Sequence, residues 1–425
     1  MILGREGYKK NVQIVHDWWI NHRTKLLLLA VALMLAASFI RLENEFYRLT
    51  LHKGLKAAID LRYRYWEVKF WFAGEPVYYQ LSHAVYPPAT HVILWPLVGW
   101  LTFEEVRWLW AITSVFMLGW LVYILVKESL AKTKMEQVFI ALLPLSMYAT
   151  GIAIGNGQLI LHILPVLLTG LFWIKRGGKW HQDLLGSFLI AIALVSPSIT
   201  APFFWIVLFV PGRIRAALLV VLIYLTFTLI ASWFQDGSTL SLIERWISIG
   251  QAGSAWGAVS GGYSNLHSWV ALFGTDEFLR FNINKWVSLI ALGGLGIWVY
   301  LHRRVDIWLL IGVSAIMARI WTYHRWYDDL LIILPMITLF RIAKRGPYPN
   351  VSDVLAAGLL VMAWCSVLAP IRLLVTPPWD GLIMTGQATV WGLMLIFLLY
   401  QARLETTRAS LNLAYARLQP NIKSK

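Results

Sequence analysis

Long apolar runs alternate with short polar segments along most of the chain. A helix needs about 20 largely apolar residues to cross the hydrocarbon core of a bilayer, and most of the runs approach that length. The pattern predicts about twelve membrane spans, at residues 25–41, 105–127, 136–154, 158–174, 183–196, 198–212, 215–233, 286–301, 306–321, 326–341, 353–372 and 383–402. We therefore expect an all-α polytopic membrane protein, with residues 1–425 forming a single integral membrane domain.

The composition fits a membrane protein and argues against other classes. Hydrophobic residues make up 58% of the chain and charged residues only 14%, with a mean hydropathy of +0.62, whereas soluble domains are roughly 45–50% apolar. These values disfavour a soluble enzyme, a disordered chain and a nucleic-acid-binding protein. The single cysteine, Cys365, excludes a disulfide framework and any metal site built from several cysteines.

The net charge of +15 indicates how the spans are oriented. Lys and Arg near span ends concentrate on the cytoplasmic side of membranes. With a cytoplasmic N-terminus, 23 of the 37 basic residues fall in cytoplasmic segments. This predicts that both termini, including a tail at 403–425, lie in the cytoplasm. It also requires that Thr90–Leu101, which is short and contains Pro96, is an interfacial helix and not a span.

Two long segments then lie on the outer side of the membrane. They cover residues 42–104 and 234–285, and we expect interfacial helices in them. Loops of this length in a compact domain are usually functional or disordered, and the aromatic content of both segments argues against disorder. We therefore expect the functional residues in or beside these two outer loops.

Ionisable residues are nearly absent from the middle of the predicted spans and gather at their outer ends. Such groups are costly inside a bilayer, so their position is informative. A secondary transporter is expected to have binding groups at the membrane midplane. This chain instead places Asp60, Arg245, Arg319, His324 and Arg372 at the outer boundary. The pattern favours an enzyme whose substrate has its reactive head at the interface and its tail in lipid, with a lipid or glycan transporter as the alternative.

The motifs of these outer segments carry a resemblance to a known family. The first loop contains Asp60-Leu61-Arg62-Tyr63, Gly74-Glu75-Pro76-Val77-Tyr78, Tyr86-Pro87-Pro88 and Pro96-Leu97. Later segments contain Gly155-Asn156-Gly157-Gln158, Ser196-Pro197-Ser198, Ser264-Asn265-Leu266-His267-Ser268 and Trp321-Thr322-Tyr323-His324. In this order they resemble the polytopic GT-C glycosyltransferases of glycosyltransferase family 87, which include polyprenol-phosphate-mannose-dependent mannosyltransferases and related arabinofuranosyltransferases.

The resemblance implies a GT-C fold and an inverting glycosyltransferase. Its donor would be a polyprenyl-phosphate-linked sugar, either mannose or a similar hexose or a pentose, and its acceptor a glycolipid or a lipid-linked glycan. The resemblance also implies a site on the periplasmic or extracellular face of a bacterial plasma membrane. We expect no cofactor, no metal and no nucleic-acid partner.

Asp60 is the candidate catalytic base. Inverting transfer needs one carboxylate to take the proton of the acceptor hydroxyl as it attacks the anomeric carbon. The neighbouring Arg62 and Arg64 are expected to lower the pKa of Asp60 and keep it ionised. Spacing alone slightly favours a surface salt bridge with these arginines, whereas the resemblance favours catalysis.

His324 and Arg325 are the candidate ligands of the donor phosphate, because cationic and hydrogen-bonding groups stabilise a phosphate leaving group. The family's hairpin lysine falls near Val195 and Ser196, which carry no charge. The candidate replacements are, in order, Arg325, Arg245 and Arg372. Contacts with the substrates are expected from Arg62, Tyr63, Tyr86, Asn156, Gln158, Asn265 and Trp321. The alternative for the segment around His324 is an interfacial belt of aromatic and basic residues.

The adjacent Asp328 and Asp329 resemble a pair of metal ligands. Neighbouring residues on a helix point about 100° apart, and Asp329 follows Arg325 by four residues. We therefore expect an Arg325–Asp329 ion pair in place of a metal site. His162, alone in an apolar run, is expected to hydrogen-bond to a neighbouring helix.

Overall fold

A computed structural model describes residues 3–54, 56–81, 83–257, 264–271, 277–346, 352–368 and 379–418, and every regular element in these ranges is a helix. The elements are α1 (Leu3–Thr50), α2 (Ile59–Phe72), α3 (Val77–Gln80), α4 (Pro88–Val98), α5 (Phe103–Glu128), α6 (Lys134–Ser146), α7 (Tyr148–Asn156), α8 (Ile160–Arg176), α9 (Trp180–Ala193), α10 (Pro197–Phe209), α11 (Ile214–Ser232), α12 (Thr239–Gly257), α13 (Leu266–Val270), α14 (Glu277–Leu301), α15 (Ile307–Ile320), the 3-10 helix η1 (Trp326–Ile332), α16 (Ile333–Arg345), α17 (Ser352–Val367) and α19 (Trp379–Leu418). The prediction of an all-helical protein is confirmed.

Several of these helices are long and apolar enough to cross a membrane. Within the described residues there are five, at Thr24–Thr50, Phe103–Glu128, Ile214–Ser232, Asn282–Leu301 and Gly381–Thr407. The pair α7 and α8 passes the same test together, although it is bent by 112°. Each of the twelve predicted spans contains a helix, but the number that crosses the membrane stays a prediction.

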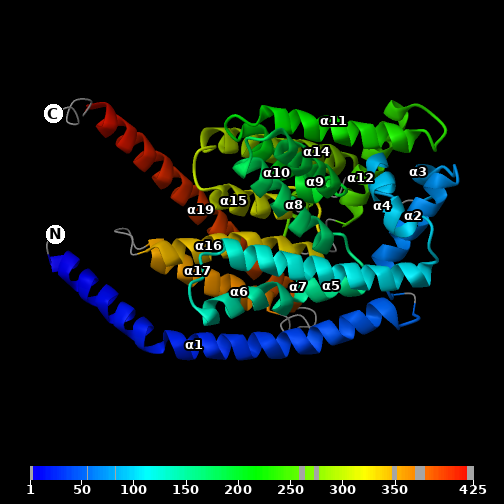
Figure 1. Cartoon of the computed structure of the whole chain (residues 1–425). Coiled ribbons are helices and arrows are strands. Elements are labelled where there is room, and N and C mark those ends of the chain that lie inside the picture. The colour runs from blue at the N-terminus through cyan, green and yellow to red at the C-terminus, as the bar shows by residue number, and fades with distance from the viewer. Residues whose placement is uncertain are drawn as a thin grey trace.

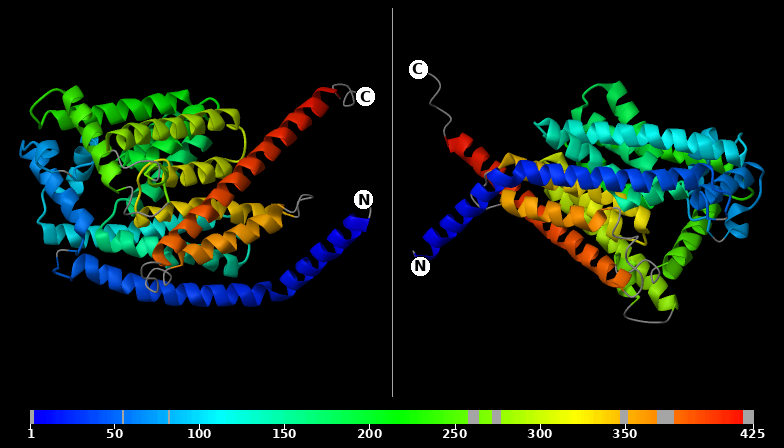
Figure 2. Two further views of the ribbon diagram at one scale, coloured as in Figure 1. Left: turned by 180° about the vertical axis from the view of Figure 1, so that it is seen from behind. Right: turned by 90° about the horizontal axis from the view of Figure 1, so that it is seen from below.

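The long helices form an elongated bundle with two different ends (Figure 1). Helices α2, α3, α4 and α12, which belong to the two expected outer loops, collect at one end, and both chain termini lie at the other. Figure 2 shows from behind and from below that α1 runs along the outside of the bundle. The two loops, distant in sequence, therefore reach the same end of the molecule.

The outward faces of the long helices are apolar. Phe116 on α5, Leu222 on α11 and Ile290 on α14 are exposed by 65%, 61% and 71%. Monomeric soluble proteins rarely expose contiguous apolar surfaces as large as these helix faces. Lipid is the medium in which such faces are stable, so the chain is a membrane protein.

Several element boundaries differ from the prediction. Helix α1 continues to Thr50, past the expected end at residue 41, because Glu45 pairs with Arg41 (2.7 Å) and Arg48 (3.0 Å) on the same helix. The span expected at 136–154 is two helices separated by Met147, which has an extended backbone. Helix α19 continues without a break through Leu418, so the last predicted span and the helix expected in the tail at 403–425 are one helix.

Candidate active site

Asp60 lies in the first turn of α2, where the helix begins without a side-chain cap. Ala58, the residue before the helix, has a left-handed backbone with φ of 47°, and its N–H donates to the carbonyl of Gly155 at 3.1 Å. This bond ties the start of α2 to the turn between α7 and α8. The free N–H groups of a helix N-terminus favour a carboxylate at this position.

Two glycines allow that turn to approach its neighbours closely. Gly157 ends α7 with a φ of 72°, and a Cβ there would lie 2.5 Å from Cβ of Leu61. A Cβ at Gly155 would lie 1.9 Å from Oε2 of Glu45 on α1. Gly157 therefore permits a contact that any other residue would block, and Gly155 leaves room for the Glu45 carboxylate.

The close approach brings Asn156 and Gln158 to Asp60. Both amide side chains act on the Asp60 carboxyl through hydrogen bonding. Asn156 is itself held from α1, because Nη2 of Arg48 donates to its Oδ1 at 2.6 Å. The structure thus brings together three residues that the sequence motifs selected independently.

Burial controls the protonation of Asp60. Desolvation raises the pKa of Asp60 above its ordinary value, although hydrogen bonds from Gln158 and Asn156 and the charges of Arg64 and Arg325 act in the opposite direction. The prediction that arginines lower the pKa is therefore wrong in its net direction. A half-buried carboxylate with a raised pKa is a stronger base than an exposed one, which suits the removal of a proton from a hydroxyl.

The two neighbouring arginines are engaged with other groups, which limits their effect. Arg64 forms an ion pair with Glu67 at 2.5 Å and lies 4.1 Å from the centroid of the Tyr86 ring. The guanidinium of Arg62 lies over the Phe103 ring at 5.2 Å. The surface salt bridge between Asp60 and these arginines that spacing allowed is absent from the described residues.

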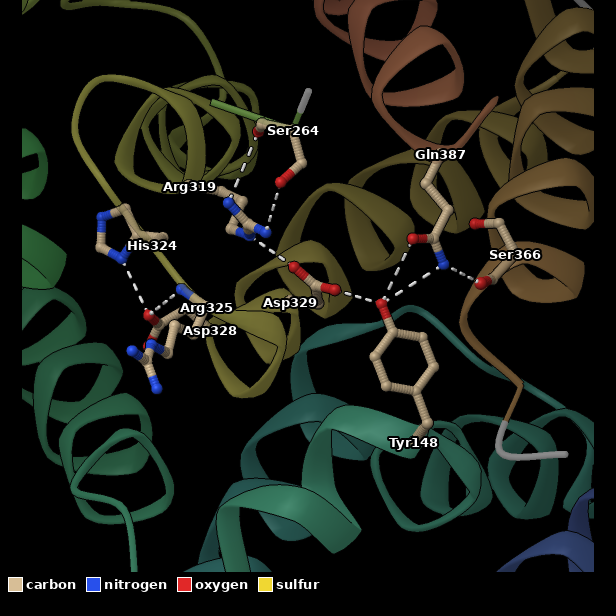
Figure 3. A network of polar contacts seen from close by, with 9 residues as sticks. All are labelled: Tyr148, Ser264, Arg319, His324, Arg325, Asp328, Asp329, Ser366 and Gln387. Carbon is tan, nitrogen blue, oxygen red and sulfur yellow. Dashed lines mark hydrogen bonds and ion pairs between the residues drawn. The ribbon is translucent and has the colours of Figure 1, made fainter. Parts of the chain in front are cut away.

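His324 is buried and oriented by Asp328. Nδ1 of the ring lies 2.9 Å from Oδ2 of Asp328, which also accepts from the backbone N–H of Arg325 at 3.3 Å (Figure 3). An ionised carboxylate only accepts hydrogen bonds, so Nδ1 carries the proton of this bond. Nε2 is buried and has no hydrogen-bond partner among the described residues. The arrangement leaves one ring nitrogen free for a ligand.

Two tyrosines connect His324–Asp328 with Asp60. The charges of Asp60 and Asp328 both act on the phenols of Tyr86 and Tyr327, and Arg325 and Asp60 attract each other electrostatically. Burial raises the pKa of Tyr86 to about 12, so its hydroxyl stays a hydrogen-bond donor at neutral pH. The candidate base and the candidate phosphate ligands therefore border one buried polar cluster.

Asp329 does not pair with Arg325. It forms a buried ion pair with Arg319 and accepts a hydrogen bond from the hydroxyl of Tyr148. The prediction failed because residues 326–332 form a 3-10 helix, in which the four-residue spacing of an α-helix does not apply. Among the described residues, no three His, Cys, Asp or Glu side chains are grouped so that they could hold a metal ion.

The remaining predicted residues are spread over the same end of the bundle. The rings of Tyr63 and His83 lie with their centroids 4.1 Å apart and their planes tilted by 39°, and Arg245 lies over Tyr79 at 4.2 Å on the exposed side of α12. Asn265 accepts from the backbone N–H of Ser268 and so caps α13. Trp321 donates to the carbonyl of Ser198 at 2.7 Å. Arg372 lies outside the described residues.

Two contributors to this cluster were missed by the sequence reasoning. Asp328 is weighed above only as a metal ligand, because residues 323–325 have no regular structure and their spacing to η1 gives no signal for the pair with His324. Arg48 was placed beyond the end of the first span, although the Arg41, Glu45 and Arg48 spacing is typical of a continuing helix.

An apolar cavity of about 440 Å³ lies behind the turns that carry Gln158 and Ser196. It is lined by side chains of α4, α5, α8, α9 and α11 and by the adjoining turns. Leu159, which directly follows Gln158, and Val195, which directly precedes Ser196, form part of its wall. His162 also lines it, and its Nε2 lies 3.0 Å from Oγ1 of Thr113 on α5, which confirms the expected hydrogen bond to a neighbouring helix.

Comparison with known proteins gives a match to a protein family. Residues 84–340 match the sequence model of glycosyltransferase family 87. The matched range contains the turn with Asn156 and Gln158 and the His324–Asp328 pair, and Asp60 lies before it. No curated protein and no solved structure matches the chain.

Proposed function

The chain belongs to glycosyltransferase family 87, and we propose that it transfers a sugar from a polyprenyl-phosphate donor to a glycolipid or lipid-linked glycan acceptor. The sugar is mannose, a similar hexose or a pentose, and the transfer inverts the anomeric configuration. The observation that carries the proposal is the meeting of Asp60 and the His324–Asp328 pair at one buried polar cluster, together with an apolar cavity whose wall includes Leu159, the residue after Gln158.

Each part of the cluster has a role in the proposed reaction. Asp60 takes the proton of the acceptor hydroxyl, whose oxygen forms the new bond to the anomeric carbon. The bond from that carbon to the phosphate oxygen breaks, and its electron pair leaves with the polyprenyl phosphate. His324 through Nε2, together with Arg325, stabilises the charge that develops on this phosphate. Asn156, Gln158 and the Tyr86 hydroxyl contact the sugar.

The cavity supports a lipid-linked donor. A polyprenyl chain needs apolar surroundings, and its phosphate must stay beside polar groups. The cavity wall includes Leu159 and Val195, next to the polar residues Gln158 and Ser196. We propose that the lipid chain lies in this cavity with its phosphate directed at His324.

We place the reaction at the outer, periplasmic or extracellular, face of the membrane. The basic residues favour cytoplasmic termini, and helices α2, α3, α4 and α12, which belong to the first outer loop (42–104) and the second (234–285), gather at the opposite end of the bundle from both termini. The tail at 403–425 is then cytoplasmic. Nucleotide sugars are made in the cytoplasm, so an outer site calls for a lipid-linked donor.

The test is a transfer assay with purified protein in lipid nanodiscs. Radiolabelled polyprenyl-phosphate-mannose, -glucose and -arabinofuranose are offered with a total bacterial lipid extract as acceptor. We expect labelled lipid product from one donor, with the opposite anomeric configuration. Asp60→Asn should lower the rate by about 10²–10⁴-fold, as expected for loss of a general base, while the thermal unfolding midpoint is unchanged.

Asp236→Asn is the matched control, because Asp236 is an exposed carboxylate at the same end of the bundle. Its rate should equal that of the unmodified protein. Transfer by Asp60→Asn within a few-fold of the unmodified protein would remove Asp60 from the mechanism. In sealed proteoliposomes of the same protein, movement of labelled lipid across the bilayer without formation of a glycoside would favour the transporter instead.

A further inference from the structure

A second buried polar network lies next to the His324–Asp328 pair (Figure 3). Its centre is Asp329, which pairs with Arg319 of α15 and accepts a hydrogen bond from the hydroxyl of Tyr148 at the start of α7. Arg319 also donates to Oγ of Ser264 at 3.2 Å. The Tyr148 hydroxyl in turn accepts from Nε2 of Gln387 on α19 at 3.3 Å. The network thus joins the first turn of η1, which carries Asp328 and Asp329, to four separate parts of the chain.

The network is fully buried, which makes a purely stabilising role a poor explanation. The side chains of Arg319 and Asp329 are each only 1% exposed. Removing two charges from water costs about as much as their attraction returns, and apolar residues of the same size often stabilise a protein as well or better. Buried ion pairs of this kind are better explained by the single geometry that they specify.

The geometry specified here is that of η1. Successive residues of a 3-10 helix point about 120° apart. Asp328 and Asp329 therefore point in different directions, the first to His324 and the second to Arg319 and Tyr148. Holding one carboxylate fixes the rotation of the short helix and so fixes the direction of the other.

We propose that Asp329, held by Arg319 and Tyr148, is a positioning residue for the active site, a role that rests on the function proposed above. It touches neither substrate. It sets the direction of Asp328, and Asp328 sets the orientation of the His324 ring whose free Nε2 faces the donor phosphate. Because Gln387 bonds to Tyr148, the C-terminal helix α19 contributes to the same orientation.

A double-mutant cycle tests this role. Tyr148→Phe removes the hydroxyl that Asp329 accepts from and keeps the ring. A hydrogen bond to a charged group contributes enough free energy to change a rate about tenfold. We therefore expect kcat for transfer from polyprenyl-phosphate-mannose to a lipid extract to fall about tenfold, with KM within about twofold of that of the unmodified protein. In a His324→Gln background the same change should cause no further loss, because the ring that it positions is gone.

Tyr224→Phe is the matched control, because the Tyr224 hydroxyl on α11 is buried and has no hydrogen-bond partner among the described residues. It should leave kcat and KM unchanged. Arg319→Lys, which keeps the charge but not the shape of the pair, should act like Tyr148→Phe. The rate of amide hydrogen exchange in the peptide covering residues 321–332 should rise in Tyr148→Phe and not in Tyr224→Phe. If transfer by His324→Gln is too slow to assay, this measurement tests the positioning role in place of the double-mutant cycle.

The outcomes separate this proposal from the proposed function. Equal losses from Tyr148→Phe with and without His324 would overturn the positioning role, as would unchanged kcat or unchanged exchange. Such results leave the transferase assignment intact if Asp60→Asn and His324→Gln still lower transfer strongly. Full transfer by Asp60→Asn and His324→Gln would instead defeat the proposed mechanism.

Discussion

The contact between Gly157 and Leu61 gives the sharpest test of how the site is assembled. Replacement of Gly157 by alanine adds a Cβ only 2.5 Å from Cβ of Leu61, in a residue with φ of 72°. Two carbon atoms need about 3.5–4.0 Å. The turn and α2 must therefore separate by about 1 Å, which moves Asn156 and Gln158 away from Asp60.

The free-energy cost of Gly157→Ala has two parts, which a second variant can separate. A left-handed backbone costs a non-glycine residue about 1–2 kcal/mol, and overpacking costs about 1–3 kcal/mol more. Gly212→Ala carries only the first cost, because φ there is 75° and no atom lies within 4 Å of the new Cβ. Displacement of catalytic groups by about 1 Å lowers rates by about 100-fold. We therefore expect Gly157→Ala, and not Gly212→Ala, to lose transfer activity by this factor.

The assay compares kcat/KM for transfer with the thermal unfolding midpoint of the same nanodisc samples. Gly157→Asn is added because asparagine tolerates the left-handed backbone but still brings a Cβ. It should recover part of the lost stability and none of the lost activity. Equal activity of folded Gly157→Ala and Gly212→Ala would show that the close approach of the turn to α2 does not position the site.

Two further predictions follow from the raised pKa of Asp60 and from the cavity. Transfer activity should fall as the pH drops through the pKa of Asp60, and Gln158→Leu, which removes a hydrogen bond that lowers this pKa, should move the midpoint of the pH profile to higher pH. Burial raises the pKa of Glu67 to about 7. If Glu67→Gln shifts the midpoint and Gln158→Leu does not, the titrating group is Glu67. Met117→Trp fills the cavity and should lower transfer from a long-chain polyprenyl donor by about tenfold, the equivalent of losing roughly two buried methylene groups of the lipid. Phe116→Trp, which changes an exposed residue on the same helix, should leave transfer unchanged. Equal effects of the two changes would count against a lipid in the cavity.

The sequence predicted the helices well because apolar length is a local property. The break at Ser196-Pro197 and the short helix α4 were also predicted, since proline acts on its own helix. The end of α1 was not, because Arg41, Glu45 and Arg48 look like the end of a span until they are seen to pair with one another. The charged residues after residue 41 thus led to the prediction of a span end, whereas their pairing with one another lets the helix continue.

The candidate site shows the same division between local and distant information. Motif order brought Asp60, Asn156 and Gln158 into one hypothesis, and the structure places them together. The pKa direction of Asp60 could not be predicted, because burial by distant segments outweighs the arginines beside it in the chain. The partner of Asp329 could not be predicted either, because it depends on the 3-10 geometry of η1 and on Tyr148, which is 181 residues away.

The position of polar and apolar residues within two turns also explains why the site suits an amphiphilic substrate. Gln158 faces Asp60 while the next residue, Leu159, lines the cavity. Val195 lines the cavity while the following turn lies against Trp321, close in sequence to His324. In both turns the change from polar to apolar surroundings occurs within three residues. A substrate that fits both turns must change from charged to apolar over an equally short length, and a phosphate esterified to a polyprenyl chain does so at a single bond.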